Sequence, residues 1–127
     1  MRSLKTIALF LVLTSALAAP ARAADHSQLQ TFATCAGRLS AVMEYQWMFD
    51  GDASEQTKRH RATVLELISA IMEPDMGRQV LQWRLSGKRA QSVLLTRATF
   101  NQDTHDAAWA REQAELFERG CTSLLLS

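Results

Sequence analysis

The chain has 127 residues, with 14 lysines and arginines against 13 aspartates and glutamates. A chain of this length supports one domain with a modest core and argues against a multidomain enzyme. The nearly balanced charge gives no general attraction for nucleic acid.

The first element in chain order is an export signal. Residues 4–19 are apolar except for Lys5 and three hydroxyl side chains, and they run into Ala21-Arg22-Ala23, the small-x-small pattern of a signal-peptidase site. We therefore predict a cleaved signal peptide at 1–23 and a single mature domain at 24–127, exported to the periplasm. The mature chain would carry 11 basic and 13 acidic residues. It contains no further apolar run of the roughly 20 residues needed to span a bilayer, so we expect a soluble protein.

The mature chain reads as helices. From Ser27 to Phe49 apolar residues recur at steps of three and four, which is typical of an amphipathic helix. Its predicted apolar stripe is Leu29, Phe32, Ala36, Leu39, Met43 and Trp47. The residues Asp50-Gly51-Asp52 favour a turn, and Ser54 with Glu55 favours the start of a second helix. Its stripe is Val64, Leu67, Ile68, Ile71 and Met72.

Pro74 predicts that the second helix ends near Met72, because proline has no amide hydrogen and disfavours helical geometry in the residue before it. A third helix follows, with the stripe Val80, Trp83, Gly87, Ala90, Leu94 and Ala98. Gly87 is unfavourable inside a helix by about 1 kcal/mol relative to alanine. We expect it to allow the close approach of a neighbouring helix or of a large ring such as Trp47; a functional hinge is the alternative.

Residues 101–103 end the third helix, and Asp103 or Thr104 can cap a fourth. This last helix carries the apolar residues Trp109, Leu116, Phe117, Cys121 and Leu124. No segment alternates with the period of two that a strand requires. The sequence thus predicts an all-α fold, a small four-helix up-down bundle.

The two cysteines, Cys35 and Cys121, test that topology. In an up-down bundle with short loops, the start of the first helix and the end of the fourth lie at the same end. Cys35 lies near the start of the first helix and Cys121 near the end of the fourth. An even cysteine count in an exported chain favours pairing over a metal site. We therefore predict a disulfide that joins the first and last helices.

The residues that support common catalytic chemistries are missing. No G-x-S-x-G elbow is present, paired cysteines leave no free thiol, and the scattered glycines match neither nucleotide-binding pattern. Carboxylate pairs drawn from Glu44, Glu66 and Glu73 keep a hydrolase as the third hypothesis. We expect no enzyme activity and name no catalytic residue.

Cofactor binding is the second hypothesis, because helical bundles hold ligands between facing helices. No two histidines have metal-ligand spacing on one helix, and no C-x-x-C-H motif is present, so we expect neither a metal site nor a cofactor. Met48 and His105 should lie at one end of the bundle. They keep open a carrier that uses the bundle interior for haem, a metal or a small ligand.

Three cations of the second helix, Lys58, Arg59 and Arg61, could contact an anionic partner. The alternative is a solvated helix face, since Glu55 can pair with Arg59 four residues later.

Two apolar groups could form an interface. Residues 45–49 place four large side chains in the last turns of the first helix, and residues 124–126 place three leucines at the end of the chain. Trp47, Phe49 and Leu125 are the candidate contact residues, and core packing is the alternative for each group. The leading hypothesis is therefore a non-catalytic binding module whose partner is a protein, another envelope component or a second copy of itself.

Overall fold

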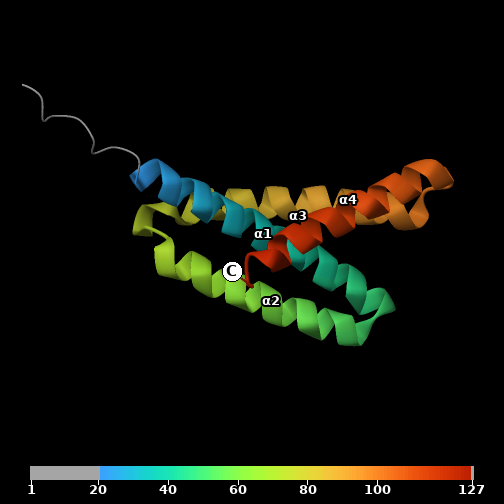
Figure 1. Cartoon of the computed structure of the whole chain (residues 1–127), viewed down its shortest axis with the longest axis horizontal. Coiled ribbons are helices and arrows are strands. Elements are labelled where there is room, and N and C mark those ends of the chain that lie inside the picture. Colours follow the sequence, from blue (N-terminus) through green and yellow to red (C-terminus); the bar gives the residue numbers. More distant parts are fainter. Residues whose placement is uncertain (1–20, 127) are drawn as a thin grey trace, which may run out of the picture.

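The computed structural model describes residues 21–126 and forms four α-helices from them (Figure 1). They are α1 (Ala21–Phe49), α2 (Gly51–Ile71), α3 (Gly77–Phe100) and α4 (Thr104–Ser123), with a short 3-10 turn, η1 (Pro74–Met76), before α3. The described residues contain no strand, which confirms the expected all-α class. Most of the expected signal peptide, residues 1–20, lies outside the described part of the chain.

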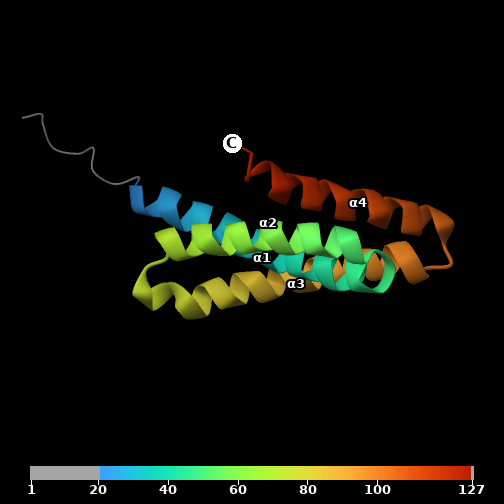
Figure 2. The same ribbon diagram turned by 90° about the horizontal axis from the view of Figure 1, so that it is seen from below.

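Successive helices run in opposite directions, as an up-down bundle requires (Figures 1 and 2). α1 is the central helix, because it packs against α2, α3 and α4, and α4 packs on both α1 and α3. The turn between α3 and α4 extends beyond the turn between α1 and α2 in both views. The α3–α4 hairpin therefore protrudes from one end of the molecule.

Local chemistry sets the helix boundaries. Asp50 is the N-cap of α2, where its Oδ1 accepts a hydrogen bond from the Ala53 amide at 3.0 Å, so one residue separates α1 from α2. The predicted three-residue turn before Ser54 is thus wrong. Asp103 caps α4 by accepting from the amides of His105 and Asp106, as predicted. α2 ends at Ile71, with Met72 in an extended conformation, also as predicted.

The helix α1 already includes Ala21, the first described residue, and so extends before the predicted start at Ser27. The cause lies in Ala21, Ala23 and Ala24, since alanine has the highest helix propensity and continues the helix without an amphipathic pattern.

Two glycines let α1 and α3 touch through their backbones. A Cβ atom on Gly37 would lie 1.9 Å from the carbonyl oxygen of Arg84, and one on Gly87 would lie 2.4 Å from that of Thr34. No real side chain fits at such distances. The close approach expected at Gly87 is therefore that of a helix; Trp47 is not among its nearest neighbours.

The core has two parts, one centred on α1 and one between α3 and α4. The larger cluster surrounds Leu29, Phe32, Leu39, Val64 and Ile68 and includes both cysteines. The smaller one lies between α3 and α4 and consists of Leu94, Ala98, Ala110 and Ala114. Small residues form the inner face of α4, whereas the larger Trp109, Leu116 and Phe117 are exposed.

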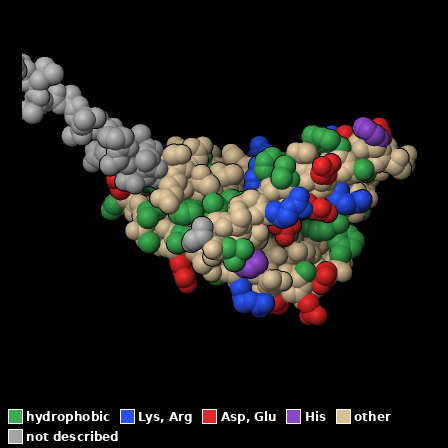
Figure 3. Space-filling view, viewed as in Figure 1, with side chains coloured by type: hydrophobic (Ala, Val, Ile, Leu, Met, Phe, Trp, Pro, Cys, Tyr) green, Lys and Arg blue, Asp and Glu red, His purple; other side chains and the backbone are tan. Residues whose placement is uncertain are grey.

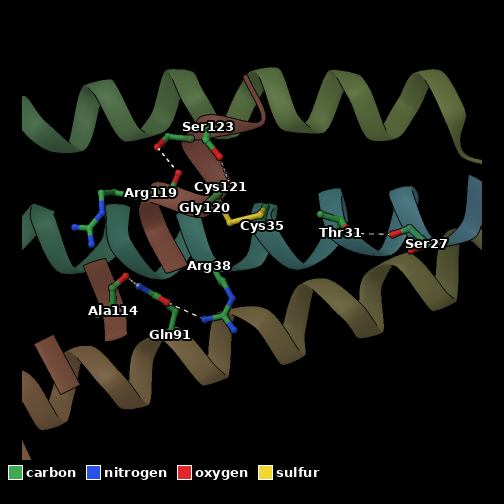
Figure 4. Close-up of a disulfide and its surroundings, with 11 residues drawn as sticks. Ser27, Thr31, Cys35, Arg38, Gln91, Ala114, Arg119, Gly120, Cys121 and Ser123 are labelled. Carbon is green, nitrogen blue, oxygen red and sulfur yellow. Dashed lines mark hydrogen bonds between the residues drawn. A yellow bond between two sulfur atoms is a disulfide. The ribbon is translucent and has the colours of Figure 1, made fainter. Parts of the chain in front are cut away.

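The disulfide joins α1 to α4, as predicted (Figure 4). The Cα atoms of Cys35 and Cys121 lie 5.3 Å apart although 86 positions separate them in sequence. Both cysteines are buried, at 7% and 2% exposure. The bond fixes the end of α4 onto the middle of α1.

Candidate functional site

The last turns of α1 are fastened to both neighbouring helices by side-chain hydrogen bonds. Two bonds reach α3 and one reaches α2: Lys88 Nζ donates to Glu44 Oε1 at 2.6 Å, the Tyr45 and Thr99 hydroxyls are 2.9 Å apart, and Thr57 Oγ1 donates to Gln46 Oε1 at 2.6 Å. Thr57 is buried, at 4% exposure. These bonds give the end of α1 a fixed position in the bundle.

Three large apolar side chains follow these bonds and point away from the core. Trp47, Met48 and Phe49 are 62%, 64% and 59% exposed, and we call them the aromatic helix end. The ring of Phe49 lies against that of Tyr45, with centroids 4.8 Å apart. Figure 3 shows hydrophobic side chains exposed on this part of the surface, between the end of α1 and the turn of the α3–α4 hairpin. Trp47 and Phe49, two of the candidate contact residues, are therefore both exposed at the end of α1.

Leu125, the third candidate, lies elsewhere. It is half-buried and packs against the larger core cluster, as Leu124 does, while Leu126 is 89% exposed. Cys121 fixes this segment beside Cys35, and Trp47 is twelve residues further along α1, about 18 Å away at 1.5 Å per residue. The C-terminal leucines and the aromatic helix end are separate surfaces.

The three candidate cations of α2 differ in their partners. Lys58 lies 3.6 Å from a carboxylate oxygen of Glu55, and both side chains are well exposed. Arg61 turns toward α1, where its Nε donates to Ser40 Oγ at 2.6 Å. Arg59 is exposed. Only part of the predicted cluster therefore faces solvent without an intramolecular partner.

Met48 and His105 are both exposed, so neither side chain enters the bundle interior. Across residues 21–126 no group of three or more histidine, cysteine, aspartate or glutamate side chains could hold a metal ion. The helices are closely packed at the Gly37–Gly87 crossing.

The sequence pattern did not single out a polar network between α1, α3 and α4. Gln91 is completely buried; its Oε1 accepts from Arg38 Nη1 at 2.9 Å and its Nε2 donates to the carbonyl oxygen of Ala114 at 2.9 Å (Figure 4). The Arg38 guanidinium also lies 3.9 Å from the centre of the Phe117 ring. The sequence did contain one indication of this network, because the polar Gln91 lies on the buried stripe of α3 between Gly87 and Leu94.

Arg38 has no acidic partner among the described residues. Burial lowers the pKa of its guanidinium, although arginine stays protonated at ordinary pH. The side chain is thus a positioned cation with an uncompensated charge.

Comparison with protein families, characterised proteins and solved structures finds no match to this chain. Its function must therefore be inferred from the residues and their geometry.

Proposed function

We propose that this chain is a non-catalytic binding module that engages another protein through the aromatic helix end. The observation that carries the proposal is the exposure of Trp47, Met48 and Phe49, each about 60% accessible, on a helix end that side chains of α2 and α3 hold in place. Contiguous exposed apolar side chains on a soluble protein are typical of an interaction site.

Rigidity favours this surface as a binding anchor. Association loses free energy when flexible side chains and loops become ordered, and a preformed surface avoids part of that loss. Large aromatic side chains also supply most of the binding energy at many protein interfaces. Trp47 and Phe49 combine both properties, since the hydrogen bonds of Glu44, Tyr45 and Gln46 fix the backbone just before them.

We further propose that the module works in the periplasm after removal of residues 1–23. The disulfide supports an oxidising compartment, because such bonds are rare in the cytosol. No helix of the described residues is long and apolar enough to cross a membrane. A second copy of the chain is the alternative occupant of the aromatic helix end.

Photocrosslinking in the native host tests this proposal. A photoreactive residue replaces Met48 in the full chain, and the matched control carries it at Gln56, which is exposed on α2. We expect a discrete adduct from position 48 and none from position 56. Adding Trp47→Ala should reduce its yield about tenfold or more, as loss of an interface hot spot does.

The mass of the adduct identifies the occupant: twice the mass of the chain means a homodimer, and any other discrete mass means a second protein. Trp47 is exposed, so its substitution should leave the thermal midpoint nearly unchanged, which circular dichroism checks. Equal crosslinking from positions 48 and 56, or an adduct insensitive to Trp47→Ala, would rule the proposal out.

A further inference from the structure

A second surface feature shares no residue with the aromatic helix end. An open groove of ≈ 550 Å³ lies between α3 and α4, and Arg38 of α1 is among its lining residues. Its apolar wall is formed by Ala90, Val93, Leu94 and Phe117. Its polar lining residues are Arg38, Arg89 and Ser86.

The charged residues that line the groove are all positive. Arg38 and Arg89 line it together, and no carboxylate is among its lining residues. Arg89 makes no hydrogen bond or ion pair with any residue in 21–126, whereas Lys88 is paired with Glu44 and Arg97 with Asp106. Two guanidinium groups without a counter-charge at a partly apolar surface favour an anion.

Arg38 is held ready for such an anion. The buried Gln91 accepts a hydrogen bond from the guanidinium of Arg38, and the amide nitrogen of Gln91 in turn donates to the carbonyl oxygen of Ala114. The Phe117 ring lies against one face of the guanidinium. Its other N–H groups donate to no described side chain or backbone group. A guanidinium fixed in this way can donate two parallel hydrogen bonds to a carboxylate, the geometry that planar arginine favours.

A second open groove, of ≈ 410 Å³, begins on the other side of Arg38 and Phe117 and runs beside the disulfide. Leu116 and Leu124 contribute its apolar lining. An apolar surface therefore continues on both sides of the positioned cation. Such a surface is suited to an anion with an apolar tail rather than to a small, fully hydrated ion.

We propose that the groove between α3 and α4 binds an amphipathic carboxylate, with the carboxylate on Arg38 and Arg89 and the aliphatic tail along Val93 and Phe117. The site is independent of the proposed partner surface, so either proposal can fail without the other.

Isothermal titration calorimetry of the full mature chain with decanoate, below its micelle concentration, tests the proposal. Two comparison ligands separate the contributions: acetate has the head without the tail, and decyltrimethylammonium has the tail with the opposite charge. We expect saturable binding of one decanoate per chain at submillimolar concentration, and much weaker binding of both comparison ligands. Chemical shifts of the Val93 methyl groups should move with decanoate, which places the tail.

Arg89→Gln is the decisive variant, because Arg89 is exposed and holds no other residue, so the fold should be unaffected. We expect it to weaken decanoate binding about tenfold, the loss expected for one charge-assisted hydrogen bond. The matched control is Arg78→Gln, an exposed arginine of α3 that does not line the groove and should bind as the unmodified chain does. No binding of decanoate, equal binding of the cationic ligand, or unchanged affinity of Arg89→Gln would overturn the proposal.

Discussion

Glu118 carries an unfavourable charge in the folded chain. Its carboxyl is half-buried on α4, and desolvation, followed by the negative charge of Glu115, raises its pKa above the usual value. The nearby Arg119 opposes this shift but also pairs with Glu115, at 3.6 Å. The folded state therefore binds the Glu118 proton more tightly than the unfolded state does. The resulting destabilisation is absent below the unfolded pKa and develops as the pH rises through the raised pKa.

Glu118→Gln should therefore stabilise the protein at pH 7, because the amide removes the buried charge. Urea unfolding followed by circular dichroism should show a higher midpoint for the variant at pH 7 and no difference at about pH 3, where a glutamate is protonated in both states. Glu112→Gln on the exposed side of α4 is the control and should change little. A lower midpoint at pH 7, or the same gain at both pH values, would contradict this account.

At the scale of the helices, small residues occupy the inner faces. They are Ala33, Ala36, Gly37, Ala41, Gly87, Ala98, Ala110 and Ala114. Helices with such faces approach closely, so the space between them cannot hold many large side chains. The larger apolar residues are then left on the outside, among them Leu81, Leu85 and Phe100 of α3. The exposed apolar surface and the close packing thus have one cause.

Gly87→Ala should destabilise the fold by about 1–3 kcal/mol, the usual loss from overpacking, although alanine is the better helix former. The added methyl group would meet the backbone of Thr34, which cannot rotate away as a flexible side chain could. Gly120→Ala is the matched control: the space around Gly120 is open, so it should gain up to about 1 kcal/mol. Chemical denaturation measures both, and a Gly87→Ala variant at least as stable as the unmodified protein would show that the α1–α3 crossing is not backbone to backbone.

At the scale of the whole molecule, α1 and the disulfide hold the bundle together. α2 packs against α1, and α4 is tied to α1 by the Cys35–Cys121 bond as well as by packing. The bond spans 86 of the 127 positions, so it restricts most of the unfolded chain. A long closed loop gives a large loss of unfolded-state entropy and hence a large stabilisation.

Replacing both cysteines, Cys35→Ala with Cys121→Ala, should lower the free energy of unfolding by about 4–5 kcal/mol in the chain-entropy model. The double substitution avoids a free thiol that could form bonds between chains. The unmodified protein under reducing conditions is the matched comparison and should lose a similar amount. Guanidinium unfolding gives both values, and a loss below about 1 kcal/mol would mean that packing alone holds α4 in place.

Part of the candidate sites could be read from the sequence. The crowding of large side chains in residues 45–49 predicted that some would not fit one buried helix face, and Trp47 and Phe49 are exposed. The separation of Leu125 from them follows from where the disulfide places α4. The groove between α3 and α4 could not be predicted, because Arg38, Arg89 and Phe117 belong to three helices and become neighbours only through packing.

The sequence by itself determined the helices, most of their boundaries and the disulfide, because periodicity, caps, proline and cysteine pairing depend on local pattern and short-loop topology. Only the tertiary structure decided which apolar face of each helix is buried. The backbone contact at Gly37 and Gly87 sets how closely α1 and α3 approach, and at these two positions the distance leaves no room even for the Cβ atom of alanine. The periodicity of a helix predicts in which direction each side chain points from the helix axis. How much space is available to that side chain depends on how closely a neighbouring helix packs, and that helix comes from a distant part of the chain.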